Sequence, residues 1–375
     1  MMKKKNIFKC GIVSIMTLVF ALGVSVLPVS ASESNNNISS KAFYIETETV
    51  PDEAIDYAVN NVFDYLVARS CEESFELYDV TMGSPFSMGK ETDNDIDVYY
   101  FPILSGEQFI YTFRVFEEDG QYTGILSPYM VEQLNKYTDD TSQSEPLYIY
   151  MQAGNVIAEK DGEIDIWEEQ HAGYEVNENQ LIALADNSVL ESTDICTPIE
   201  YKKEAIPRAV SSKTLSLDMA ETQGDQQWCA AFAMSSILRY KGAGSSVTAE
   251  AIVKYFYPNS TNLKNESVSR TQLVNYAKNK GYSKTTNSSS TLSNSTVVSE
   301  IGNDTPIYAG CAGSGSYEKA RHALVICGYN NTKSTYTVWN PWYSYTETMS
   351  QSTKKYVVNS SSSFTWDCTI YKVRK

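Results

Sequence analysis

The chain has 375 residues, of which 42% are apolar and 20% charged, and its formal net charge is −16. This length suits two domains of ordinary size, and the composition excludes a collagen, a coiled coil and a wholly disordered chain. Residues 1–31 carry +4, residues 32–208 carry nine basic and 36 acidic side chains (−27), and residues 209–375 carry 17 basic and ten acidic side chains (+7). Such a division favours an acidic part that attracts a basic part, although a solvated acidic face would give the same count.

The first 31 residues have the pattern of a secretory signal peptide. A run of lysines, residues 3–5, gives a positive start, residues 12–27 are almost wholly apolar, and residues 29–31 are small enough for a signal-peptidase site. A membrane anchor is the alternative, but the apolar run is near the short end for a bilayer span. We therefore expect a secreted, extracellular product with no membrane association after signal cleavage.

Residues 32–208 predict an α+β unit. Apolar residues at helical spacing predict a helix over residues 51–69, and residues 128–137 predict a second, short helix. Runs rich in Tyr, Val, Ile and Phe, separated by Gly-containing turns, predict strands. These strands cover residues 97–104, 109–116, 122–126, 147–152, 155–159 and 164–167. We expect one helix beside a curled antiparallel sheet.

Residues 192–213 lack a periodic apolar pattern and contain Pro198, Lys202, Lys203, Pro207 and Arg208. We interpret them as an exposed linker, because proteolytic cuts concentrate in such segments. A cut between Arg208 and Ala209 would separate the acidic part from the basic part.

Residues 209–375 predict helices first and a sheet last, which is again an α+β arrangement. The helices are expected over residues 229–241, 248–255 and 270–280. The Ser-, Thr- and Asn-rich residues 283–295 predict a loop. The strands are expected over residues 306–310, 322–329, 335–340, 355–358 and 369–373.

The seven cysteines match neither a zinc-binding pattern nor a regular disulfide framework. We therefore expect no metal and no cofactor, and the redox states of Cys311, Cys327 and Cys368 stay open.

Cys229 opens the strongest helical pattern in the chain. The N-terminus of a helix carries partial positive charge and free N–H groups, which favour a thiolate placed there. The thiolate is the nucleophilic form of cysteine. A buried structural cysteine is the alternative, because that is a common fate of a free cysteine.

The chain has only two histidines, and His322 begins an apolar run that predicts an inner strand. His171 lies in an acidic segment and is interpreted as a surface residue. A hairpin centred on residue 331 would place Asn340 directly opposite His322, where the amide oxygen could accept from one imidazole nitrogen. Trp342 could then lie across the pair and keep water out. A buried structural histidine is the alternative.

Gln223 lies six residues before Cys229, in a loop with Gly224. Its amide and the backbone N–H of Cys229 could together bind the oxyanion of an acyl-transfer intermediate.

The segment from Gln223 to Trp228 and Cys229 resembles the nucleophile segment of papain-like cysteine peptidases. His322-Ala323-Leu324 resembles their histidine strand, and Asn340-Pro341-Trp342 their Asn-x-Trp. The bacterial staphopain branch is the nearer likeness, with its Trp-Cys-Ala-Ala and its short catalytic domain.

The resemblance implies a papain-like catalytic domain, with helices around the cysteine helix and a C-terminal antiparallel sheet or barrel, preceded by a half-barrel-like propeptide. It implies catalytic roles for Cys229, His322 and Asn340, an oxyanion hole at Gln223, and supporting roles for Trp228 and Trp342.

Two features depart from the papain and cathepsin branch. His322 follows Cys229 by 93 residues, fewer than the roughly 130–150 of that branch, and its Cys-Gly-Ser-Cys-Trp signature is absent. A Cys-His peptidoglycan amidase or endopeptidase, an amidating transferase and a secreted binding protein with a dead site are the alternatives.

The expected organisation is a signal peptide (1–31), an acidic inhibitory propeptide with its linker (32–208) and a peptidase domain (209–375), together a zymogen. An adhesion domain retained on the enzyme is the alternative for the acidic part. The expected partners are a protein or peptide substrate and the chain's own propeptide as an intramolecular inhibitor, with a dedicated protein inhibitor as an open addition and no nucleic acid.

Overall fold

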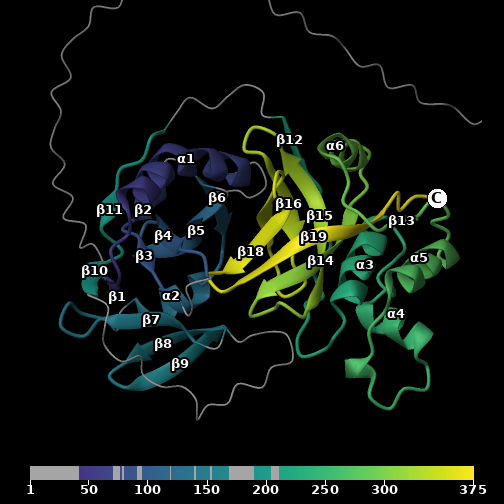
Figure 1. Ribbon diagram of the computed structural model, residues 1–375, viewed down its shortest axis with the longest axis horizontal. Helices are drawn as coiled ribbons and strands as arrows, with labels where there is room; N and C mark the ends of the chain where they lie inside the picture. Colours follow the sequence, from purple (N-terminus) through teal and green to yellow (C-terminus); the bar gives the residue numbers. More distant parts are fainter. Residues whose placement is uncertain are drawn as a thin grey trace, which may run out of the picture. The chain divides into compact units, whose positions relative to one another are not determined.

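The computed structural model describes residues 42–70, 77, 80–90, 95–118, 120–138, 141–152, 154–168, 190–203 and 211–375. Residues 40–375 cluster into one compact unit. Its architecture is mixed α and β and rich in sheet, as predicted (Figure 1). The predicted signal peptide, His171, Cys71 and the Arg208–Ala209 bond lie outside the described residues. Within the described part of the chain, no helix has both the length and the apolar character needed to cross a bilayer.

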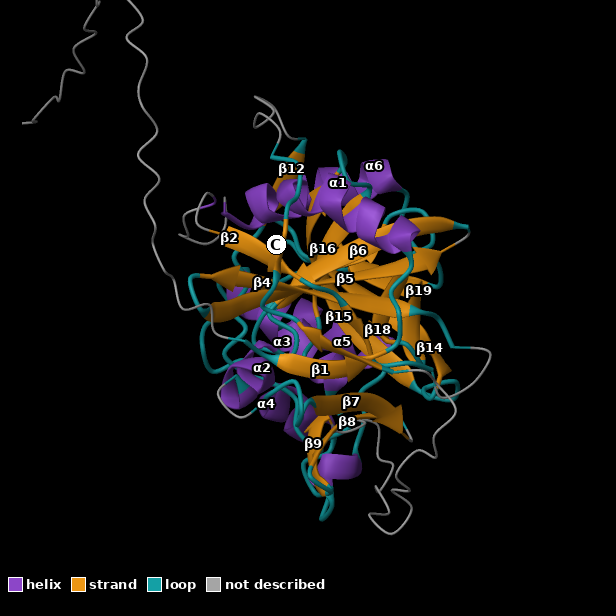
Figure 2. Cartoon of the chain, turned by 90° about the vertical axis from the view of Figure 1, so that its left-hand side faces the viewer, coloured by secondary structure: helices purple, strands orange, loops and turns teal. Residues whose placement is uncertain are grey.

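Residues 42–203, here called the N-terminal segment, contain two sheets where a single antiparallel sheet was expected. Figure 2 shows β7, β8 and β9 apart from β4 and β5. The first sheet has the order β10-β1-β7-β8-β9, with β1 and β7 parallel. Its strands are Tyr44–Thr47 (β1), Leu147–Gln152 (β7), Asn155–Lys160 (β8), Glu163–Glu168 (β9) and Glu191–Asp194 (β10).

The second sheet is antiparallel and has the order β11-β2-β4-β5-β6, with β3 on β4. Its strands are Val80–Gly83 (β2), Phe86–Ser87 (β3), Val98–Ser105 (β4), Gln108–Glu118 (β5), Gln121–Ser127 (β6) and Pro198–Ile199 (β11). Helix α1 (Asp52–Ser70) lies beside this sheet (Figure 1) and buries Ala58, Val62 and Leu66 against it. The short helix α2 spans Val131–Tyr137.

Strands β10 and β11 correct the predicted linker. Residues 191–194 pair with β1, and residues 198–199 pair with β2. This part of the chain therefore belongs to the two N-terminal sheets, because backbone pairing does not require the apolar periodicity that the segment lacks. At the far end of the predicted linker, β12 (Ser212–Thr214) pairs with β15 of the C-terminal sheet.

Residues 211–375, here called the C-terminal segment, place helices beside one antiparallel sheet. The helices are α3 (Cys229–Tyr240), α4 (Ala249–Phe256), α5 (Arg270–Asn279) and α6 (Asn294–Gly302), with a 3₁₀ turn at Leu263–Asn265. The eight-stranded sheet has the order β13-β19-β14-β15-β16-β17, with β12 on β15 and β18 on β19. Its other strands are Thr286–Ser288 (β13), Ile307–Gly315 (β14), Arg321–Asn330 (β15), Thr335–Trp339 (β16), Thr346–Ser350 (β17), Lys355–Asn359 (β18) and Ser362–Tyr371 (β19).

Helix α3 is the central element of this segment. Its apolar face carries Met234, Ile237 and Leu238, all fully buried in one core with β14 and β15. Figure 1 shows α3, α4 and α5 gathered beside the sheet. The start of α3 is thereby fixed beside the start of β15, and these two ends carry Cys229 and His322.

Candidate active site

Cys229 is the first residue of α3, and its side chain is half-buried. The preceding residue, Trp228, makes no side-chain cap, so the first N–H groups of the helix stay available to the sulfur. The sulfur lies 4.0 Å from the carbonyl oxygen of Arg321, the residue before His322. The helix start and the histidine strand therefore meet at the thiol.

Burial raises the pKa of the Cys229 thiol to about 11, and the backbone N–H groups of Ala230, Ala323 and Cys229 itself lower it. The favourable helix terminus predicted from the sequence is present, but removal from water outweighs it in this form of the protein. The thiol is therefore protonated at neutral pH unless a neighbouring base accepts its proton.

His322 and Asn340 are joined by a hydrogen bond of 2.8 Å between Nε2 and Oδ1. The backbone N–H of Trp342 donates to the same oxygen at 3.1 Å. A backbone N–H can only donate, so this second bond fixes which end of the amide is oxygen. Nε2 of His322 must then carry the ring proton in the neutral state, and Nδ1 is left with its lone pair.

The hairpin that carries this pair has a different register from the one predicted. Val325 pairs with Trp339 and Ile326 with Val338, so Asn340 continues opposite Leu324 and not opposite His322. The turn lies later than residue 331, and a register shift between Ile326 and Gly328 only partly compensates for this. His322 and Asn340 are diagonal neighbours, which are still within reach of longer side chains.

Aromatic rings cover the imidazole. The ring of Trp342 lies 4.3 Å from that of His322 between centroids, and the ring of Phe364 lies 4.9 Å away. His322 is consequently only 5% exposed. The predicted position of Trp342 across the pair is observed, whereas Phe364 comes from β19 and had no signal in the sequence.

Gln223 is held close to this pair by its own backbone, which donates to the carbonyl of Pro341 at 2.7 Å. Its side-chain amide donates to the carbonyl of Gln226 at 2.5 Å. Within the described residues, Oε1 of Gln223 has no hydrogen-bond partner. The loop before α3 is thus tied to the residue that follows Asn340.

One cleft of about 800 Å³ brings these groups together. Cys229, His322, Gln223 and Trp342 all line it. Asn340 is fully buried behind the imidazole, and Trp228 packs below the cleft with its indole N–H on the carbonyl of Leu263. The arrangement offers a thiol, a base with a fixed tautomer and N–H donors at one surface, which are the parts needed for acyl transfer.

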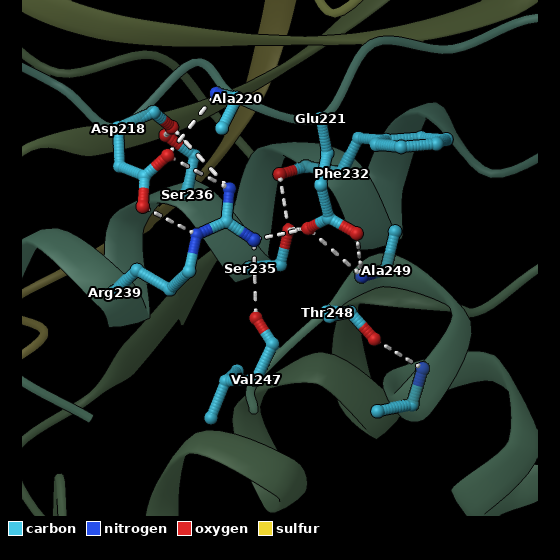
Figure 3. A network of polar contacts seen from close by, with 11 residues as sticks. Asp218, Ala220, Glu221, Phe232, Ser235, Ser236, Arg239, Val247, Thr248 and Ala249 are labelled. Carbon is cyan, nitrogen blue, oxygen red and sulfur yellow. Dashed lines mark hydrogen bonds and ion pairs between the residues drawn. The ribbon is translucent and has the colours of Figure 1, made fainter. Parts of the chain in front are cut away.

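A polar network anchors the chain that leads to Gln223 (Figure 3). Arg239 of α3 donates to Asp218 at 2.9 Å and forms an ion pair with Glu221. Glu221 also accepts from the backbone N–H of Ala249, at the start of α4, and from the hydroxyl of Ser235. One guanidinium therefore fixes residues 218–221 to two helices, next to the loop that carries Gln223.

Replacement of Arg239 by methionine should lower the free energy of unfolding by about 1–3 kcal/mol, because Glu221 and Asp218 lose their charged donor. Urea unfolding of the full chain measures this change. Lys254→Met is the matched control, since the Lys254–Glu250 pair is exposed and its loss should cost about 0.5 kcal/mol or less. Equal effects of the two changes would show that the network anchors nothing.

Comparisons with known proteins find relatives among cysteine proteases. Residues 211–373 match the family model described as staphopain peptidase C47. The chain is 24% identical to staphopain A of Staphylococcus aureus strain MSSA476 and 25% identical to that of strain Mu50. These alignments cover 95% of this chain and 98% and 97% of the relatives. An extracellular cysteine protease of Staphylococcus epidermidis is 21% identical over 99% of this chain and its own full length.

Taken with the fold, these matches define a cysteine-type endopeptidase, an enzyme that acts on protein or peptide substrates. More narrowly, the segment 211–373 belongs to the staphopain peptidase family.

Proposed function

We propose that this chain is a secreted zymogen whose C-terminal segment, with a papain-like fold, hydrolyses peptide bonds through a thiolate acyl-enzyme. The observation that carries the proposal is the Nε2–Oδ1 bond between His322 and Asn340 at the cleft that Cys229 enters from the start of α3. Nδ1 of His322 accepts the thiol proton, and the thiolate attacks the substrate carbonyl. The imidazolium then gives its proton to the leaving amine, and water releases the acyl group.

The oxyanion of the intermediate is proposed to bind between the amide of Gln223 and the backbone N–H of Cys229. One hydrogen of the amide NH₂ donates to the carbonyl of Gln226, which leaves the second hydrogen for the oxyanion. Trp342 and Trp228 support the site, the first by covering His322 and the second by packing under the start of α3.

The N-terminal segment is proposed to be an inhibitory, half-barrel-like propeptide, removed near Arg208 and Ala209. The cleft is lined by residues between Gln223 and Cys368, so no described residue of the N-terminal segment enters it. We therefore assign the inhibitory contacts to β17 and β18, where side chains of the N-terminal segment are buried. N-terminal sequencing of secreted material should begin near Ala209, and a stable, fully active 32–375 species would contradict this role.

The thiol provides a prediction on pH. In His322→Gln, the alkylation rate of Cys229 should rise with pH up to about 11, the pKa that burial gives the thiol, because the base proposed to accept its proton is missing. Four pH units below its pKa, about 10⁻⁴ of a thiol is ionised. Iodoacetamide should therefore label the variant at pH 7 far more slowly than the unchanged chain. Similar rates at pH 7, measured by mass spectrometry, would rule out His322 as the base.

Parallel digestion of casein and of purified cell wall tests the function as a whole. The processed enzyme should cleave casein and leave peptidoglycan intact. Release of wall fragments without casein cleavage would establish a cell-wall amidase or endopeptidase instead.

A further inference from the structure

The hydrogen bond between His322 and Asn340 continues through a line of buried polar side chains. Nδ2 of Asn340 donates to the hydroxyl of Tyr356 at 3.2 Å, and that hydroxyl donates to Oε2 of Glu347. Oε1 of Glu347 is bound by the guanidinium of Arg114. Tyr356 and Glu347 are 0% and 1% exposed. The line begins behind the imidazole and ends at an arginine of the N-terminal segment.

Each bond in this line has only one chemically allowed direction. Arg114 can only donate, and an ionised Glu347 can only accept, so the Tyr356 hydroxyl must direct its proton to the carboxylate. The oxygen of Tyr356 then accepts from the NH₂ group of Asn340, which leaves the amide oxygen for Nε2 of His322. The carboxylate, through Tyr356, thus selects the same orientation of the amide and the same ring tautomer as the Trp342 N–H does from the other side.

Burial and the negative charge of Glu347 raise the pKa of Tyr356 well above its usual range. The phenol therefore keeps its proton at every pH at which the enzyme would work, and the direction of the line does not reverse.

Arg114 is held at this place by more than its ion pair. One guanidinium nitrogen donates to the carbonyl of Val358 on β18 at 2.5 Å, and the group lies 4.4 Å above the ring of Tyr129. Burial lowers the pKa of Arg114, but Glu347 and the neighbouring tyrosines together outweigh this and hold the pKa above its ordinary value. A permanently charged group of the N-terminal segment therefore compensates the buried carboxylate.

We propose that Tyr356 and Glu347 are positioning residues of the peptidase, which hold the Asn340 amide with its oxygen toward His322, and that Arg114 is the group that neutralises Glu347 in the precursor. This inference rests on the proposed function of His322 and Asn340. Removal of the N-terminal segment exchanges Arg114 for water or another donor at Glu347, whereas Tyr356 and Glu347 stay with the catalytic residues and keep the amide in the same orientation.

The test uses the two histidines of the chain. With His171→Gln as background, ¹⁵N-histidine labelling of the full chain gives an imidazole spectrum from His322 alone. The unchanged network should show one tautomer, protonated on Nε2. In Tyr356→Phe, the amide loses its partner at Nδ2 and is held only by the Trp342 N–H at Oδ1, so the spectrum should show the second tautomer beside the first.

Tyr336→Phe is the matched control. Tyr336 is also fully buried in this sheet, but its hydroxyl contacts Lys354 and takes no part in the line. The control should keep the single Nε2 tautomer. In the processed enzyme, Tyr356→Phe should lower kcat by about 10- to 100-fold, the loss seen when partners behind metal-bound histidines are removed. KM should stay within about twofold, because the substrate does not touch Tyr356.

An unchanged tautomer and kcat in Tyr356→Phe would overturn the proposal, and so would equal losses in the two variants. If Tyr356→Phe does not fold, Glu347→Gln is examined in the same way, since it keeps the size of the side chain and removes the charge. The spectrum can be recorded without activity, so it separates this inference from the proposed function. If the tautomer depends on Tyr356 but Cys229→Ala still hydrolyses casein, only the proposed function is refuted.

Discussion

Replacement of Cys229 by alanine should lower the rate of casein hydrolysis by on the order of 10⁴-fold or more, with the fold unchanged. Binding and oxyanion donors alone cannot replace a missing nucleophile, because no acyl-enzyme can form. The sulfur is half-buried at the end of α3, so its removal leaves the core behind the helix intact. Release of peptides from casein by the processed enzyme measures the effect, and circular dichroism verifies the fold.

Cys327→Ala is the matched control for this change. Cys327 is another cysteine of the C-terminal segment, but it is buried in β15 and its sulfur contacts the carbonyl of Thr337. Its loss should leave kcat within about twofold, since it touches neither the substrate nor His322. An epoxide reagent should label the unchanged chain and Cys327→Ala but not Cys229→Ala. Casein hydrolysis by Cys229→Ala at more than a few per cent of the normal rate would remove Cys229 from its proposed role.

The sequence predicts helices and strands best where a long apolar face meets clear end signals. Helix α3 begins at Cys229 as predicted, because its apolar face is broad and Gly242 follows its end. Helix α1 and strands β4 to β8 also lie within a few residues of their predicted bounds. Strands β4 and β5 are buried on both faces, so runs of aromatic and β-branched residues indicate them without any alternation.

Helix α6 and strands β13 and β17 were missed because their local signals are weak. Residues 294–302 form a helix capped by the Ser293 hydroxyl, although the Ser-rich run before it resembles a loop. Strand β13 falls in the residues predicted as a loop and pairs with β19 at residues 369–371. Pairing with a strand that is distant in the sequence stabilises such segments. The local sequence of β13 does not predict its pairing with β19, about 80 residues later.

Some residues of the candidate site could be predicted from local motifs, and others could not. Cys229, His322, Asn340 and Gln223 carry local motifs, and the structure brings them to one cleft and its wall. Tyr356 and Glu347 lie in short strands where a Tyr and a Glu are ordinary, so no motif indicates them. Arg114 did leave a signal, because a charged residue stands between Phe113 and Val115 in an otherwise apolar strand. Such a residue is rarely buried without a partner.

The charge division predicted that the acidic part attracts the basic part. The contacts between the N-terminal and C-terminal segments follow this charge pattern only in part. Lys333 of the C-terminal segment pairs with Asp64 of α1, as the net charges suggest. The buried contacts have the opposite polarity, since Arg69 and Arg114 come from the acidic segment and reach Thr346 and Glu347 of β17. Net charge acts over long distances, whereas individual buried pairs fix the docked position.

Replacement of Arg114 by methionine should destabilise the full chain by about 3–5 kcal/mol, because Glu347 then keeps a buried charge with no cation to compensate it. The second change, Glu347→Gln, should recover part of this loss, so the two variants should not be additive. Urea unfolding of the four members of this double-mutant cycle measures the coupling.

Lys333→Met provides the control between the same two segments. The Lys333–Asp64 pair is partly exposed, with Asp64 at 34%, so its loss should cost only about 1 kcal/mol. If Arg114→Met costs no more than this control, the pair with Glu347 contributes little to docking. A large cost that Glu347→Gln relieves would instead mean that the carboxylate behind Tyr356 and Asn340 is stable only while it has a cationic partner. The proposed processing must then be coupled to a rearrangement of water or side chains around Glu347, since an enzyme without the N-terminal segment would retain that carboxylate and lack Arg114.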